Sequence, residues 1–180
     1  LGGLGLGNLE ALIVLEEFAK VSPAVAFPIF ESSVGPVRAV EHFANADLAK
    51  QIVPKVCAGE MVVAVAMSEP EAGSALTDLK TRAEISGGKI VLNGQKRWCS
   101  GGGHADAYVV YCKLSDAPGA KGIGAVLVEK EAKGLSFGAR ERLMGFRGVP
   151  SADIFFDNVE VPEENLIVPA GGFKQLMEAF

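Results

Sequence analysis

The sequence predicts an α+β multidomain chain: a helical N-terminal part, a middle domain that is a β-barrel or β-sandwich, and the start of a second helical bundle. Apolar residues recur at helical spacing over residues 8–59, and short apolar runs with glycine-bearing turns fill the chain from Met61 onward. Strands do not alternate with helices, which argues against a Rossmann fold. We place the three parts at residues 1–60, 61–163 and 164–180.

The N-terminal part carries start and stop signals for several helices. Asn8 is a candidate cap for the first helix, and Ser22 followed by Pro23 is a second start signal. Pro28 is expected to end or bend that second helix. Asn45 opens a further helix, whose inward positions are Leu48, Ile52 and Val56.

The middle part is predicted to be a succession of strands. The run Met61–Met67 is apolar throughout, which suits a strand buried on both faces. Gly87-Gly88 separates two strand-like stretches, and Asn93-Gly94 is a strong signal for a hairpin turn. Strands are expected near Thr81–Ile85, Lys89–Leu92, Tyr108–Cys112, Gly124–Val128 and Ile154–Phe156.

Both ends of the chain suggest an internal piece of a longer protein. The chain starts without a methionine. After Gly171-Gly172, the spacing of Phe173, Leu176, Met177 and Phe180 predicts the first turns of a new helix, within which the sequence stops.

Charge and cysteine content argue against several classes of protein. The net charge of −5 gives nucleic acid no general electrostatic footprint. Cys57, Cys99 and Cys112 form no C-x-x-C pair, so we expect neither a disulfide framework nor a metal site, and we expect a reducing, cytoplasmic location. No apolar run reaches the roughly 18 residues of a membrane span, so no membrane partner is expected.

Two motifs could carry chemistry. In the first, residues 66–74 (AMSEPEAGS), Ser68 and Ser74 supply hydroxyls and Gly73 allows a backbone N–H to approach a phosphate. In the second, residues 93–103 (NGQKRWCSGGG), the single tryptophan, Trp98, can cover an aromatic ring whose edge Ser100 can hydrogen-bond. Taken alone, each segment is better explained as a polar turn or as an ordinary core tryptophan.

Together and in this order, the two motifs resemble the flavin-binding signatures of the acyl-CoA dehydrogenase family. Residues 66–74 follow the first signature, and Asn93, Gly94, Lys96, Trp98 and Ser100 follow the second, Asn-Gly-x-Lys-x-Trp-x-(Ser/Thr). Residues 143–147 and 156–162 are similar to late segments of the family's middle β-barrel. This domain lies between two helical domains in the family, which is the order expected above.

The resemblance implies FAD as cofactor and assigns roles to residues. Backbone from Val65, Ala66 and Met67 would line the pyrimidine side of the flavin, which Ser68 would hydrogen-bond. Gly73 and Ser74 would approach the pyrophosphate, with Ser74 also near the acyl-CoA. Trp98 and the neighbouring Cys99 would pack along the isoalloxazine, with Ser100 near N5. The resemblance makes Glu69 a structural member of its loop.

Three positions depart from the family pattern, and one of them is Val65, where an aromatic residue is often found. Ala75 stands where an aspartate is usual, and Asp78 stands where a small residue is common. The missing carboxylate puts flavin affinity or the rigidity of this loop in question.

The implied activity is α,β-dehydrogenation of an acyl-CoA thioester to a trans-2-enoyl-CoA. Electrons would pass to an electron-transfer flavoprotein, and the assembly would be a homodimer or homotetramer. The catalytic base is expected beyond residue 180, so no catalytic residue is expected here and the piece alone should be inactive. Two alternatives stay open: a same-fold oxidase, flavin monooxygenase or desulfinase, and a non-enzymatic β-sandwich interaction module.

Overall fold

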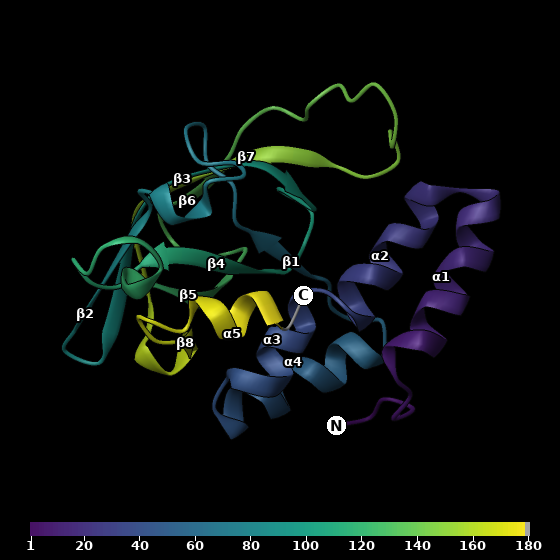
Figure 1. Cartoon of the computed structure of the whole chain (residues 1–180), viewed down its shortest axis with the longest axis horizontal. Helices are drawn as coiled ribbons and strands as arrows, with labels where there is room; N and C mark the ends of the chain where they lie inside the picture. Colours follow the sequence, from purple (N-terminus) through teal and green to yellow (C-terminus); the bar gives the residue numbers. More distant parts are fainter. Residues whose placement is uncertain (179–180) are drawn as a thin grey trace.

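Helices and strands are segregated along the chain in the order that the sequence predicts, which confirms the fold class (Figure 1). The computed structural model describes residues 1–178. Within them, the helical part comprises α1 (Asn8–Val21), α2 (Pro23–Ser33), α3 (Pro36–Phe43) and α4 (Ala46–Cys57). The strands are β1 (Val63–Ala66), β2 (Arg82–Ser86), β3 (Lys89–Ser100), β4 (Ala107–Lys113), β5 (Ile123–Glu129), β6 (Leu135–Phe137), β7 (Ser151–Pro162) and β8 (Leu166–Val168).

A new helix, α5 (Phe173–Glu178), begins where the apolar spacing predicts it, although Phe180 lies outside the described residues. No helix within residues 1–178 is long and apolar enough to cross a membrane.

The helix start signals hold at two of three positions. The Asn45 side chain accepts hydrogen bonds from the backbone N–H groups of Asp47 and Leu48, at 3.1 and 2.9 Å, and so caps α4. Pro23 occupies the first position of α2. Asn8, however, is not the cap of α1. Gly7 takes that position. Its backbone N–H donates to the carboxylate of Glu10, the third residue of the helix, at 2.9 Å.

Pro28 does not end α2, which continues to Ser33. A proline removes one hydrogen bond from the helical ladder. The helix nevertheless continues, and it is in contact with α1, α3 and β1. The expectation that Pro28 ends the helix was therefore wrong, and the alternative of a bend at Pro28 stays a prediction.

All the strands belong to one sheet, with the order β6-β7-β3-β2-β4-β5-β8 and with β1 added alongside β4. The β1–β4 pair is parallel, whereas β3–β7 and β4–β5 are antiparallel. Side chains of β4 alternate between two cores, which explains why this strand is buried on both faces. One core, which also contains α3 and α4 side chains, takes Ala107, Val109 and Tyr111; the core inside the curved sheet takes Tyr108, Val110 and Cys112.

Strand β1 shows the same double burial that the sequence predicts for Met61–Met67. Val63 packs toward the helices, and Ala64 and Ala66 pack inside the sheet. All three side chains are fully buried. The end of β1 is consequently fixed in position, and the loop that starts at Met67 leaves the sheet from a rigid point.

Asn93-Gly94 is not a hairpin turn, contrary to the prediction. It lies inside β3, where the pairing with β7 changes register between Leu92 and Gly94. The Asn93 side chain accepts the Asn158 N–H at 2.9 Å, and a Cβ on Gly94 would lie 2.6 Å from Thr81 Oγ1. The glycine therefore serves a close backbone approach rather than a turn.

The turn between β2 and β3 is Gly87-Gly88, as predicted, because Ser86 pairs with Lys89 across it. The short strands β6 and β8 were not predicted. Three-residue strands carry too few residues for an alternating pattern to be visible in the sequence.

Candidate functional site

The loop after β1 is fastened to β3 at three points. The Arg97 N–H donates to the Ser68 carbonyl at 2.9 Å. The Lys96 ammonium donates to the Met67 carbonyl at 2.9 Å and to the Glu69 carboxylate at 2.8 Å. The two motifs singled out in the sequence, almost thirty residues apart, are thus joined directly to each other.

The Lys96–Glu69 ion pair that joins them is buried. The Lys96 side chain is completely enclosed, and the Glu69 carboxylate also accepts the backbone N–H groups of Lys80 and Thr81, at 2.6 and 2.9 Å. Burial by itself would raise the pKa of Glu69, but the charge of Lys96 and these hydrogen bonds lower it overall. Burial disfavours the charged form of Lys96 as well and so lowers its pKa. The charge of Glu69 offsets part of that effect.

Trp98 lies at an irregularity of β3. The register between β3 and β7 changes between Lys96 and Cys99, and the Trp98 backbone has a φ of 61°, in the left-handed region. This conformation turns the indole out of the sheet, where it is 53% exposed. The Arg97 guanidinium lies over the indole ring, 4.5 Å from its centre. The tryptophan is therefore not an ordinary core residue.

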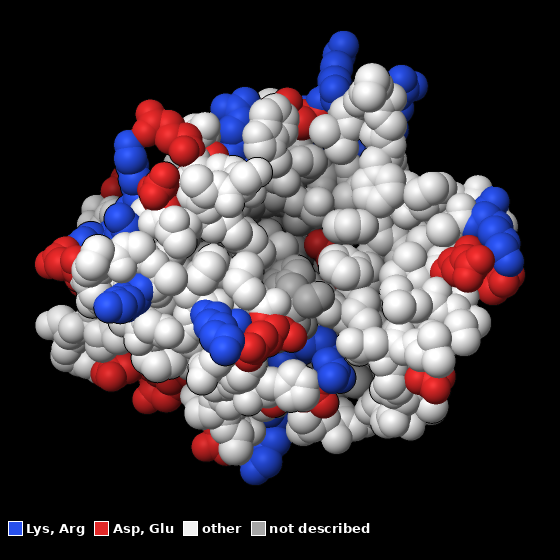
Figure 2. Space-filling view, viewed as in Figure 1, with Lys and Arg blue, Asp and Glu red and all other residues white. Residues whose placement is uncertain are grey.

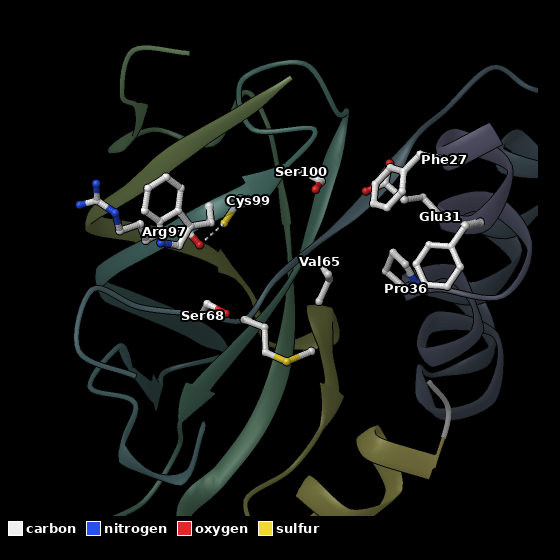
Figure 3. Close-up of a pocket in the computed structure, with 11 residues that line it drawn as sticks. Phe27, Glu31, Pro36, Val65, Ser68, Arg97, Cys99 and Ser100 are labelled. Atoms are coloured by element: carbon white, nitrogen blue, oxygen red, sulfur yellow. Dashed lines mark hydrogen bonds between the residues drawn. The ribbon is translucent and has the colours of Figure 1, made fainter. Parts of the chain in front are cut away.

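A hollow opens between the sheet and the helical part, in the middle of the face shown in Figure 2. The β-domain wall of this hollow comes from the end of β1, the loop after it and the end of β3. The opposite wall comes from α2 and the start of α3 (Figure 3). Its lining residues are Phe27, Phe30, Glu31, Pro36, Val65, Met67, Ser68, Arg97, Trp98, Cys99 and Ser100.

Six of the nine predicted site residues line this hollow: Val65, Met67, Ser68, Trp98, Cys99 and Ser100. Three do not. The Ala66 side chain is buried in the core inside the sheet, so only its backbone could serve a ligand. Gly73 and Ser74 are exposed on the loop that follows and lie outside the lining.

Cys99 lines the hollow as an unreactive thiol. Burial raises its pKa to about 12, with the nearby charge of Lys96 offsetting part of the effect. A thiol with such a pKa stays protonated near neutral pH and is a poor nucleophile. All three cysteines are free.

Glu31 is the functional candidate that the sequence did not reveal. It is the single charged residue of α2 (PAVAFPIFESS), and its side chain points across the hollow toward Ser100 (Figure 3). The residue is 5% exposed, and burial raises its pKa to about 7. The sequence shows only a glutamate after a phenylalanine, and nothing in the pattern places it opposite residues of β3.

A second hollow is lined by Arg140, Glu141, Arg142, Leu143, Arg147 and Val149, on the loop before β7. It contains none of the predicted site residues. In residues 1–178, no group of three or more histidine, cysteine or carboxylate side chains is arranged to hold a metal ion.

Comparison with families of known proteins matches almost the whole chain. Residues 1–60 match the acyl-CoA dehydrogenase N-terminal domain, and residues 64–159 match the acyl-CoA dehydrogenase middle domain. Mitochondrial isovaleryl-CoA dehydrogenase of Arabidopsis thaliana is 38% identical over 170 residues, which cover 94% of this chain and 42% of that protein.

Two further relatives widen the comparison. The 3-sulfinopropanoyl-CoA desulfinase of Variovorax paradoxus is 33% identical over 97% of this chain and 45% of its own length. The crystal structure of an acyl-CoA dehydrogenase from Geobacillus kaustophilus superposes with a TM-score of 0.94 at 31% identity, over 99% of this chain and 47% of that one. The chain thus spans less than half the length of these relatives.

Proposed function

This chain belongs to the acyl-CoA dehydrogenase family, and we propose that it works as the flavin-holding part of an FAD-dependent dehydrogenase of acyl-CoA thioesters. Members of the family are flavoprotein oxidoreductases that act on acyl-CoA. The finer proposal is α,β-dehydrogenation to a trans-2-enoyl-CoA, with an electron-transfer flavoprotein as electron acceptor and a homodimeric or homotetrameric assembly in the cytoplasm.

One observation carries this proposal: Ser68 and Trp98 line the same hollow, and the Ser68 carbonyl accepts a hydrogen bond from the N–H of Arg97, the residue before Trp98 in β3. The fit to a flavin follows from the chemistry of this wall. A half-exposed indole offers a flat apolar face, while the hydroxyls of Ser68 and Ser100 offer hydrogen bonds to the heteroatoms at a ring edge. An aromatic ring with polar edges is the ligand that this combination suits.

The predicted site residues of this wall each have a proposed task. Ser68 hydrogen-bonds the pyrimidine edge, and the backbone of Val65, Ala66 and Met67 shields it from water. Trp98 covers the ring, Ser100 donates a hydrogen bond at its edge, and the neutral Cys99 thiol fills the space between them.

Gly73 and Ser74 extend the proposed site toward the pyrophosphate, and Ser74 also toward the acyl-CoA. Both are exposed, and a Cβ on Gly73 would meet no atom within 4 Å, so this segment is open to a ligand. FAD, when bound, would supply the hydride acceptor of the reaction. The chain's own residues bind and orient the ring and leave its opposite side facing α2.

A reaction other than dehydrogenation is the second candidate, because a desulfinase is 33% identical over nearly the whole chain. The residues described here hold a flavin in either case. The proton-abstracting base decides between the two, and we expect it outside residues 1–180. A glutamate at that position would favour dehydrogenation.

The test is reduction of the bound flavin under anaerobic conditions. The full-length protein, loaded with FAD, should lose its flavin absorbance when a saturated acyl-CoA is added, and it should release a trans-2-enoyl-CoA. When the same acyl-CoA is added to residues 1–180 with FAD, the flavin should stay oxidised. A full-length protein that binds FAD but is not bleached by any saturated acyl-CoA would contradict dehydrogenation, and one that binds no FAD would contradict the site.

A further inference from the structure

Glu31 is a buried carboxylate without a counter-ion. Within residues 1–178 no side chain or backbone group forms a hydrogen bond or ion pair with it, whereas the other buried acidic residue, Glu69, is paired with Lys96. Neither Glu31 oxygen is among the completely enclosed polar atoms that lack a partner, so the carboxylate retains contact with the hollow. An unpaired carboxylate in such a place must be satisfied by water or by a ligand.

The surroundings of Glu31 leave its charge uncompensated. Its own wall of the hollow is apolar and contains Phe27, Phe30 and Pro36. Arg97 is the cation in the lining, but its guanidinium points away from α2 (Figure 3). It lies instead on the Trp98 ring and 3.7 Å from both Glu141 and Asp153. The field of the Glu31 carboxylate is therefore directed at whatever occupies the hollow.

We propose that Glu31 is a specificity-determining residue that disfavours acyl groups ending in a carboxylate and favours neutral or hydrogen-bond-donating ends. This inference rests on the proposed function. If a flavin ring lies on the wall formed by Ser68, Trp98 and Ser100, the acyl group must lie between that ring and α2, next to Glu31. Two like charges about 6 Å apart in an interior of effective dielectric ~20 repel strongly enough to change affinity by about a hundredfold.

Glu31 is also the group here that titrates near neutral pH. The neighbouring ionisable groups of the β-domain are Cys99 and Tyr108, and burial raises the pKa of each to about 12. The elements that pack against α2 carry charged or ionisable side chains that are exposed or half-buried and do not line the hollow: Glu10, Glu16, Glu17 and Lys20 on α1, Arg38, Glu41 and His42 on α3, and Arg147 on the loop before β7. The selectivity should therefore follow the protonation of Glu31.

The experiment compares two acyl-CoA thioesters of equal chain length, hexanoyl-CoA and adipoyl-CoA, on the FAD-loaded full-length protein. The ratio of their kcat/KM values should shift against adipoyl-CoA by up to about tenfold between pH 6 and pH 8, because Glu31 becomes ionised over that range. In Glu31→Gln the ratio should no longer depend on pH. At pH 8 the kcat/KM for adipoyl-CoA, relative to that for hexanoyl-CoA, should be higher than in the parent protein. Glu17→Gln, an exposed acidic position on α1, is the matched control and should leave the ratio unchanged.

A second measurement separates this inference from the proposed function. Calorimetric binding of thioether analogues of the two ligands, which cannot be dehydrogenated, should show the same charge preference and the same loss of it in Glu31→Gln. Absence of turnover with preserved selective binding would overturn the dehydrogenase proposal alone. Unchanged ratios in Glu31→Gln, equal loss of turnover with both acyl groups, or no binding of either analogue would overturn the role of Glu31.

Discussion

The ammonium of Lys96 lies 2.8 Å from the Glu69 carboxylate, and both side chains are shielded from solvent at the point where the loop after β1 meets β3. Glu69 belongs to the first sequence motif and Lys96 to the second. The ion pair therefore holds Ser68 and Trp98 on one wall of the hollow.

Replacing Lys96 by methionine should destabilise the fold by about 3–5 kcal/mol, because the Glu69 carboxylate would be left buried without its counter-ion. The double variant Lys96→Met, Glu69→Leu should be less destabilised than the sum of the single variants. Urea unfolding measures both. Lys89→Met, which breaks the exposed pair with Glu160, is the control and should change stability by about 1 kcal/mol or less. Equal losses at the two lysines would contradict the argument.

Glu31 should make the protein less stable as pH rises. Its pKa is about 7 in the fold against 4.5 for an ordinary glutamate, so the folded state holds an extra proton between these values. The free energy of unfolding should fall through this window by at most about 3 kcal/mol and stay constant above it. Glu31→Gln should match the parent below pH 4.5 and exceed it at pH 8. Thermal unfolding of both proteins below pH 4.5 and at pH 8 measures this. A difference in stability between variant and parent that is the same at both pH values would contradict the prediction.

Trp98 should matter for flavin binding more than for folding. Its indole is half-exposed, and its backbone lies in a region that favours glycine. Trp98→Gly should leave the urea midpoint unchanged or raise it, while FAD affinity falls by about tenfold from the loss of ring stacking. Trp98→Phe should keep most of the affinity. A glycine variant that unfolds readily, or that binds FAD normally, would argue against this role.

Two glycines should respond in opposite ways to alanine. A Cβ on Gly94 would lie 2.7 Å from Thr81 Cα and 2.6 Å from its Oγ1, at a φ of 145°, so Gly94→Ala should cost about 2 kcal/mol or more. A Cβ on Gly73 meets nothing within 4 Å, so Gly73→Ala should fold normally. Any loss of FAD affinity in Gly73→Ala would then report on the cofactor site itself, and unchanged affinity would remove Gly73 from it.

The motif residues show what sequence reasoning could anticipate about the arrangement of the chain, while their role in flavin binding stays a prediction. Ser68, Trp98 and Ser100 were singled out by residue type and order, and the structure brings them to one hollow. The Asn93-Gly94 turn was wrong for a physical reason: a glycine with unusual dihedral angles suits a turn and a close backbone contact equally well, and only the neighbouring Thr81 shows which applies.

The sequence by itself determined the order of helices, strands and helix, because hydrophobic periodicity and turn chemistry are local properties of the chain. The same locality determined the caps of α4 and α2 and the double burial of β1. Only the tertiary structure decided that Glu31 faces Ser100 across a hollow, that Ala66 points into the core while its neighbours line a wall, and that Lys96 pairs with Glu69. These relationships depend on how residues far apart in the chain pack together, and burial, charge pairing and pKa follow from that packing.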